Sequence, residues 1–205
     1  MPHKLSAVLI SGRPQTARSR PGLLEFGDKK VVERTLAAYS DFAQVILVVT
    51  GDLQGFPPAG GNLKVVGTPE GASVGEQVRA GLGAMDSSNQ GFALGLLDQA
   101  LLTPELVNAM AEKFLGGKAK ILVPLSLKQI GQPAFFRSAL SADFTKLAEG
   151  ETAWAVLKKN GDEVDTFDTN ETTVLRNIED IDDYHAMLHL AGLPVPEPAE
   201  EGADS

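Results

Sequence analysis

An acidic residue closes an apolar run near the middle of the chain, and this combination is the strongest sign of chemistry in the sequence. Residues 93–97 are apolar or glycine, and Asp98 follows them directly. Thr103, Pro104 and Glu105 are typical of the N-cap and first turn of a helix. A carboxylate at the end of a buried strand faces the crevice where open α/β sheets bind ligands, and it commonly holds a divalent metal against phosphate oxygens. The alternative is that Asp98 caps a turn.

Three arginines follow a glycine after the first apolar run. Gly12 precedes Arg13, Arg18 and Arg20 in a chain whose net charge is −9. Glycine lets a backbone approach a phosphate, and guanidinium groups bind phosphate oxygens in bidentate fashion. The segment has neither the glycine spacing of a dinucleotide-binding turn nor a G-K-[ST] sequence. It therefore predicts a triphosphate-binding arm, with a basic surface loop as the alternative.

Apolar runs typical of strands alternate with runs of helical periodicity along nearly the whole chain. This alternation predicts βαβ units around a mainly parallel sheet, and hence a three-layer α/β/α sandwich. We expect strands at residues 5–11, 44–50, 63–66, 91–97, 120–123, 133–136 and 174–177. We expect helices at 31–39, 75–85, 104–114 and 180–191, with one or two more within 144–159.

The composition excludes several classes of function. The 205 residues contain no cysteine, so disulfides, thiolate metal sites and a cysteine nucleophile are excluded. The excess of acidic residues disfavours a nucleic-acid partner. No apolar run reaches the roughly 20 residues of a membrane span and no signal peptide is evident, so we expect a cytoplasmic protein without a membrane partner. We predict one domain over residues 1–192 and a disordered, acidic, proline-rich tail over 193–205.

Partial motifs, in the same order along the chain, resemble those of the MobA-like nucleotidyltransferase family, which includes molybdenum-cofactor cytidylyl- and guanylyltransferases. Leu97-Asp98-Gln99 with Thr103-Pro104-Glu105 is similar to the family's G-D-Q-P-x-v-T-P-E, in which the Asp binds magnesium. Gly131-Gln132-Pro133 is similar to its G-H-P. The other matching segments are residues 9–13 with 23–27, 28–36, 75–82 and 177–184. The resemblance covers about residues 5–190 and implies a Rossmann-like sheet of the nucleotide-diphospho-sugar-transferase type.

The resemblance also implies an activity. A member of this family transfers CMP or GMP from an NTP to a phosphorylated acceptor, such as a molybdopterin-type cofactor, and releases pyrophosphate. The implied partners are an NTP, with CTP favoured over GTP, and a small phosphorylated acceptor. The implied cofactor is Mg²⁺, with Asp98 and Asn177 at the metal-ligand positions. The chain is expected to be a monomer or a homodimer.

Roles follow for the remaining site residues. The chemistry of guanidinium groups assigns neutralisation of the triphosphate during catalysis to Arg13, Arg18 and Arg20. The resemblance assigns nucleotide contacts to Ser11, Gly12, Gly75, Glu76 and Gln77. Trp154 and Phe167 are candidates for the wall of the acceptor pocket, with packing in the core as the alternative for both.

The chain departs from the family pattern at several of these positions. The first loop lacks the family's lysine, whose place falls on Pro21 or, with a shifted alignment, at Gly22 or in a gap. Leu97 replaces a glycine, Gln132 replaces a histidine, and Asn177 replaces an aspartate. These departures support a second hypothesis, a relative that binds a nucleotide or a partner protein without turnover. A third hypothesis is an unrelated α/β binding protein.

Overall fold

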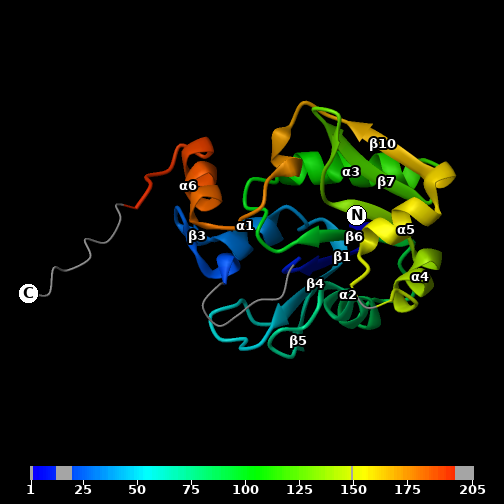
Figure 1. The fold of residues 1–205 in the computed structure, drawn as a ribbon, viewed down its shortest axis with the longest axis horizontal. Coiled ribbons are helices and arrows are strands. Elements are labelled where there is room, and N and C mark those ends of the chain that lie inside the picture. The colour runs from blue at the N-terminus through cyan, green and yellow to red at the C-terminus, as the bar shows by residue number, and fades with distance from the viewer. Residues whose placement is uncertain (1, 13–19, 149, 197–205) are drawn as a thin grey trace, which may run out of the picture.

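The centre of the fold is an eight-stranded sheet, seen in Figure 1, in a computed structural model that describes residues 2–12, 20–148 and 150–196. The strand order is β10-β7-β9-β6-β1-β4-β5, with β8 paired to β7, while β2 and β3 form a separate ribbon. The strands are β1 (His3–Ile10), β2 (Glu25–Phe26), β3 (Lys29–Lys30), β4 (Phe42–Thr50), β5 (Leu63–Thr68), β6 (Gly91–Leu96), β7 (Ile121–Ser126), β8 (Gln129–Ile130), β9 (Ala134–Arg137) and β10 (Val164–Asp168).

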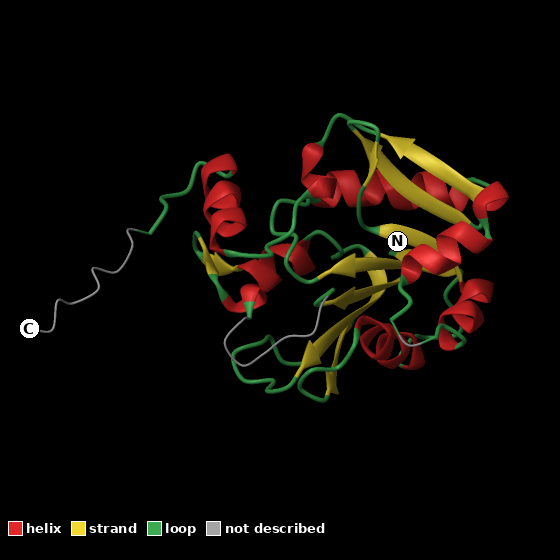
Figure 2. Cartoon of the chain, in the orientation of Figure 1, coloured by secondary structure: helices red, strands yellow, loops and turns green. Residues whose placement is uncertain are grey.

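Helices flank this sheet on both sides (Figure 2). The helices are α1 (Val31–Ala37), α2 (Val74–Gly83), α3 (Pro104–Gly116), α4 (Ser141–Thr145), α5 (Ala153–Lys159) and α6 (Ile181–Leu190). Short 3-10 turns lie at η1 (Pro21–Leu23), η2 (Ser138–Leu140), η3 (Gly161–Glu163) and η4 (Thr172–Leu175). None of the helices in the described part of the chain is long and apolar enough to cross a membrane.

The two faces of the sheet carry separate hydrophobic cores. Along β1, Leu5, Ala7 and Leu9 belong to the core under α1 and α3, whereas Val8 and Ile10 belong to the core under α2, α4 and α5. This alternation follows from the two-residue period of a strand. Most neighbouring strands are parallel, but β9 runs antiparallel to both β6 and β7. The predicted three-layer α/β/α fold is confirmed.

The prediction fails for the last strand. Residues 174–177 do not form a strand, because they hold the end of the turn η4. Val174 is nevertheless buried, and its carbonyl oxygen accepts a hydrogen bond from the Gln132 N–H at 2.8 Å. The last strand is β10, which the apolar pattern does not predict because its polar and apolar residues alternate at a half-exposed edge of the sheet. The other predicted elements are present, with ends that differ by up to three residues.

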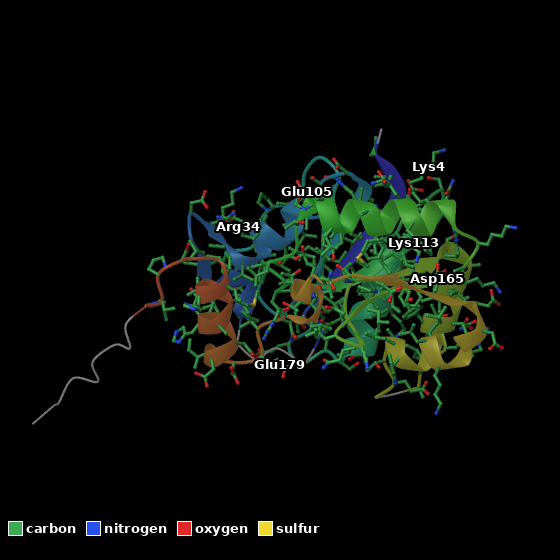
Figure 3. All side chains as sticks on the ribbon, turned by 90° about the horizontal axis from the view of Figure 1, so that it is seen from above. Lys4, Arg34, Glu105, Lys113, Asp165 and Glu179 are labelled. Atoms are coloured by element: carbon green, nitrogen blue, oxygen red, sulfur yellow. The ribbon has the colours of Figure 1, made fainter. Side chains whose placement is uncertain are left out.

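The edge strand β10 is parallel to β7 and is also attached to helix α3. Lys113 of α3 and Asp165 of β10 form an ion pair of 3.5 Å, and Figure 3 shows the two side chains next to each other. Both side chains are about half exposed, so the pair contributes little to stability. The parallel pairing with β7 is therefore the main attachment of this strand.

Helix α6 packs against the β2–β3 ribbon and forms a third hydrophobic cluster (Figure 1). Phe26, Tyr184 and Met187 are buried in this cluster. Leu193, the first residue of the predicted tail, also packs there, with its Cδ2 atom 3.2 Å from the position that a Cβ on Gly27 would occupy. The later part of that tail, residues 197–205, lies outside the described residues.

The two tyrosines of the chain differ in the bonding of their hydroxyl groups. The Tyr184 hydroxyl donates a hydrogen bond to the Glu25 carbonyl oxygen. The Tyr39 hydroxyl is buried in the core and has no hydrogen-bond partner among the described residues, and burial raises the pKa of its phenol. The two side chains therefore form a matched pair for a stability test.

We expect Tyr184→Phe to lower the free energy of unfolding by about 1 kcal/mol, because a bonded hydroxyl is lost. Tyr39→Phe should leave that free energy unchanged or raise it, because an unbonded polar group leaves the core. Urea unfolding of both variants measures the difference. Equal losses of stability in the two variants would contradict the expectation.

Candidate active site

The carboxyl ends of β1 and β6 lie side by side at one edge of the sheet. Ile10 pairs with Leu96 in the parallel register, and the Leu97 N–H donates to the Ile10 carbonyl oxygen at 2.8 Å. Ser11 and Asp98 therefore leave the sheet at the same edge and from neighbouring strands. This edge is where open α/β sheets bind their ligands.

A cavity of about 520 Å³ lies at this edge. The residues that line it come from the turn after β1 (Ser11 and Gly12), from α2, from residues 130–132 and from the start of α5, which includes Trp154. Asn177 also lines the cavity. The volume suits a small-molecule ligand. Three of the predicted site residues, Ser11, Gly12 and Asn177, are thus brought together by the fold.

Ser11 and Gln77 are bonded to each other beside this cavity. The Ser11 N–H donates to Gln77 Oε1 at 2.9 Å, and the Ser11 hydroxyl donates to the same oxygen at 2.6 Å. Gln77 Nε2 donates to the Ala72 carbonyl oxygen at 3.0 Å. Gln77 has no exposed surface, so its amide supports the wall from behind.

Gly12 occupies a position that only glycine fits. Its φ is +72°, which lies in the left-handed region, and a Cβ added to it would lie 2.5 Å from Leu96 Cδ2. Gly12 therefore presents bare backbone at the cavity wall. A backbone without a side chain is what close approach of a phosphate group requires.

Glu76, a predicted nucleotide contact, is bonded within the first turn of α2. Its carboxylate accepts hydrogen bonds of 2.8 Å from both the Ser73 N–H and the Ser73 hydroxyl, while Ser73 Oγ accepts one of 3.3 Å from the Glu76 N–H. The bond from the Ser73 backbone and then that from its hydroxyl lower the pKa of the Glu76 carboxyl group. In this arrangement Glu76 and Ser73 cap the helix. Gly75 lies in the same turn.

The predicted metal ligands Asp98 and Asn177 come from two segments that contact each other. Gln99 Nε2 donates to the Arg176 carbonyl oxygen at 3.4 Å, which joins the neighbours of the two ligands. Asp98 is only 1% exposed, whereas Asn177 is half-buried and its Nδ2 donates to Glu179 Oε1 at 3.4 Å. One carboxylate and one amide oxygen suit Mg²⁺, which takes its other ligands from water and substrate phosphates. No cluster of three or more His, Asp or Glu side chains suited to a metal occurs in the described part of the chain.

Of the three predicted arginines, only Arg20 lies within the described residues, since Arg13 and Arg18 fall outside them. The Arg20 guanidinium donates to the Asp52 carbonyl oxygen and lies 3.9 Å from the Asp52 carboxylate. It also stacks over the Phe56 ring, 5.0 Å from its centre. The loop after β4 therefore holds the Arg20 side chain.

The two aromatic candidates for the acceptor pocket differ. Trp154 lines the cavity and is 57% exposed, whereas Phe167 packs against the core beside β7 and does not line it. The sequence did not indicate two other lining residues, Thr152 and the 43% exposed Ile130. For Ile130, the signal that could have found it is its position directly before the Gly131-Gln132-Pro133 motif.

The sequence model of the MobA-like NTP transferase domain matches residues 7–164. That span covers most of the 205 residues and includes the second half of β1, all of α2 and the lining residues of the cavity up to Leu157. The chain belongs to the MobA-like NTP transferase family. No curated protein sequence matches this MobA-like domain.

Solved structures share its fold. The homolog of Mycobacterium tuberculosis Rv0371c from Mycobacterium sp. strain JC1 has a TM-score of 0.76 at 20% identity, over 94% of this chain and 98% of that one. The manganese complex of Rv0371c from M. tuberculosis H37Rv has a TM-score of 0.75 at 19% identity, over 92% of this chain and 100% of that one. The 4-diphosphocytidyl-2C-methyl-D-erythritol synthase of Anaerococcus prevotii has a TM-score of 0.72 at 17% identity, over 92% of this chain and 98% of that one. At these identities the likeness establishes the nucleotidyltransferase type of fold.

Two departures of this MobA-like domain from its family pattern meet in the structure. Leu97 precedes Asp98 where the pattern has glycine, and Gly22 is one position on which the missing lysine falls. A Cβ on Gly22 would lie 2.7 Å from Leu97 Cδ1 and 3.3 Å from Phe56 Cε1. Leu97 is fully buried, so a side chain at position 22 and the leucine at position 97 exclude each other.

Gly22→Ala should therefore lower the free energy of unfolding by about 1–3 kcal/mol through overpacking. Leu97→Ala should lower it by about 2–5 kcal/mol through loss of buried surface. Alanine at position 97 leaves room for a side chain at position 22. The double variant should therefore lose about 1 kcal/mol less free energy of unfolding than the two single variants lose together. Urea unfolding of the four proteins measures this coupling, and strictly additive losses would contradict it.

Proposed function

We propose that this MobA-like domain transfers CMP or GMP from an NTP to a small phosphorylated acceptor, with a molybdopterin-type cofactor as the candidate acceptor. Its membership in a nucleotidyltransferase family supports the reaction class. The observation that carries the proposal is the cavity at the carboxyl edge of the sheet, which Gly12 and Asn177 both line. The name of the Anaerococcus neighbour, a diphosphocytidyl compound synthase, supports a cytidine nucleotide, so we favour CTP over GTP.

The proposed reaction needs no protein nucleophile. An oxygen of the acceptor phosphate attacks the α-phosphorus of the NTP, and a new P–O bond forms. The bond between the α-phosphorus and the oxygen that bridges the α- and β-phosphates breaks, and its electron pair leaves with pyrophosphate. Because two anions must approach each other, catalysis depends on positioning and on neutralisation of charge.

We place the nucleotide against the wall formed by Ser11, Gly12 and the start of α2. Gly12 offers bare backbone there, which supports close approach of a phosphate. Gly75 in the first turn of α2 lies next to Val74, which lines the cavity, and is proposed to contact the nucleotide through its backbone. Arg13 and Arg18 are proposed to neutralise the triphosphate. Arg20, which is bonded to the loop after β4, is proposed to act from that anchored position.

Asp98 and Asn177 are the proposed ligands of Mg²⁺. The contact between their neighbouring residues, Gln99 and Arg176, supports a shared site. A manganese complex of one structural neighbour supports a divalent cation in this fold. A cation bound there would withdraw charge from the phosphates. Asp98 contributes the negative charge of the site, and Asn177 contributes a neutral oxygen.

Asp98→Asn tests this assignment because it keeps the shape of the buried side chain and removes its charge. We expect the Mg²⁺-dependent part of CTP binding to be lost. Pyrophosphate release should fall by at least about 100-fold, since a metal ligand that acts on the transition state is worth several kcal/mol. Thermal shift with CTP, with and without Mg²⁺, and a pyrophosphate assay with molybdopterin and other phosphorylated acceptors measure the two effects.

Asp86→Asn is the matched control. Asp86 lies in the loop before β6, at the opposite edge of the sheet, and its carboxylate accepts a hydrogen bond from the Ser88 N–H at 2.9 Å. The control should keep the full response to CTP and Mg²⁺. An unchanged response in Asp98→Asn would refute the metal assignment. Stabilisation of the native protein by nucleotide without pyrophosphate release would favour the binding role without turnover, and no stabilisation by CTP or GTP would refute the transferase proposal.

We place the acceptor against the part of the cavity that Trp154 and Ile130 line. Both side chains expose apolar surface. An indole ring offers a large, rigid contact face at low entropic cost. The acceptor is therefore expected to rest on Trp154 while its phosphate points toward the nucleotide.

Trp154→Ala should raise the KM for the acceptor by about 10-fold, because an aromatic contact worth about 1.4 kcal/mol is lost. The KM for the NTP should stay within about 2-fold of the native value. Trp154→Phe, which keeps a ring, is the control and should recover most of the loss. Since Trp154 is the only tryptophan, its intrinsic fluorescence reports acceptor binding directly. A variant that raised only the KM for the NTP would contradict this placement.

A further inference from the structure

One buried amide group links the two segments proposed to contact the nucleotide. Gln77 lies in α2, and its side chain bonds to the end of β1 on one side and to the loop that enters α2 on the other. We propose that Gln77 is a positioning residue that sets the spacing between these two segments. This inference rests on the proposed function, because it concerns the nucleotide site.

The geometry of the amide makes it suitable for this role. Gln77 Oε1 accepts both the N–H and the hydroxyl of Ser11, at 2.9 and 2.6 Å, and Nε2 donates to the Ala72 carbonyl oxygen at 3.0 Å. The oxygen and nitrogen of an amide belong to one rigid, planar group with fixed donor and acceptor sides. Ser11 and Ala72 therefore cannot move apart without breaking a buried hydrogen bond.

The attachment of α2 to β1 reinforces this link. Gly81, one turn further along α2, approaches β1 so closely that a Cβ on it would lie 2.4 Å from Val8 Cγ1. The helix is thus fixed to the strand both by backbone contact at Gly81 and by hydrogen bonds at Gln77. These two contacts restrict the movement of the cavity-lining residues at the end of β1 and the start of α2.

Gln77 acts through Ser11 and not on the ligand itself. Its side chain has no exposed surface, and it does not appear among the described residues that line the cavity. Both hydrogen-bond donors of Ser11 are directed at Gln77 Oε1. The family resemblance assigns Ser11 and Gln77 to nucleotide contact. The structure supports a different role for this pair, which is to hold Gly12 in its left-handed turn.

A second buried glutamine, Gln44 of β4, bonds to β1 at Ser6 and lies away from the cavity that Ser11 and Gly12 line. Gln44 Oε1 accepts the Ser6 hydroxyl at 2.9 Å and the Asp86 N–H at 2.9 Å, while Nε2 donates to the Ala84 carbonyl oxygen at 3.3 Å. Gln44 is also buried, with 7% exposure. Both glutamines therefore use a buried amide to bond a serine of the β1 segment to a neighbouring carbonyl group, and Gln44 is a matched structural control.

The experiment compares Gln77→Met with Gln44→Met, since methionine keeps the length of the side chain and removes its hydrogen bonds. Both variants should lose similar free energy of unfolding in urea. Calorimetric titration with CTP and Mg²⁺ should show a Kd raised by about 10-fold or more in Gln77→Met and by less than about 2-fold in Gln44→Met. Equal changes of Kd in the two variants would overturn the inference.

A second variant covers the case in which Gln77→Met does not fold. Gln77→Glu keeps an acceptor for Ser11 and loses the donor to Ala72, so it should raise the Kd for CTP by about 3-fold or more. A native Kd in Gln77→Glu would overturn the inference that the bond to Ala72 sets the spacing.

Amide exchange separates this inference from the proposed function. Deuterium uptake by the peptide that contains residues 10–12 should be faster in Gln77→Met than in Gln44→Met at equal stability. If the native protein binds no CTP or GTP, the proposed function fails, and the exchange rates alone decide whether Gln77 holds the turn. If the native protein binds nucleotide and the uptake of the two variants is equal, the positioning role fails and the proposed function stands.

Discussion

The pairing of β1 along both edges is the constraint on which the rest of the structure depends. Residues 5–10 of this strand are buried on both faces and hydrogen-bonded in parallel to β4 and β6. A strand enclosed in this way cannot slip by one residue, because every core side chain would turn to the wrong face. The points at which β1 and β6 end are therefore fixed. Ser11 and Asp98 therefore follow the ends of two neighbouring strands at the same edge of the sheet.

The same physics explains how far the sequence could predict the fold. The buried strands are continuous apolar runs, as parallel strands covered on both faces must be, so β1, β4 and β6 were recognisable. The edge strand β10 has one half-exposed face, and its alternating residues resemble a polar loop. At Val174 the error is the opposite, since a strand was predicted where the chain forms a 3-10 turn. An apolar residue can be buried from such a turn as completely as from a strand. Hydrophobicity predicted burial at both places, but it did not predict the backbone.

Residue types selected candidate residues that the fold brings to one edge of the sheet, but they did not show what the polar side chains bond to. Gly12 could be predicted because its conformation is a property of glycine itself. The roles of Gln77 and Glu76 depend on partners that the chain brings near only after folding. Gln77 is directed at the end of β1 by the packing of α2, and Glu76 is engaged by Ser73 in the helix cap. A polar residue in a candidate ligand-binding segment can thus stabilise the segment without contacting the ligand. Only its hydrogen-bond partners distinguish the two roles.

The contact between Gly22 and Leu97 changes how the departures from the family pattern should be interpreted. Read from the sequence, the absent lysine and the leucine before Asp98 are two separate losses. In the structure Leu97 fills the space in which a side chain at position 22 would begin. If the family's lysine is aligned with Gly22, the two departures are therefore one change, in which a charged side chain is replaced by apolar packing. Burial of Leu97 holds the turn that carries Asp98, and this explains how the turn keeps its shape without the glycine of the pattern. The exchange keeps the turn that carries Asp98 and removes a cation, so on the proposed mechanism the rate must depend on Arg13, Arg18 and Arg20, while the geometry of the turn depends on packing.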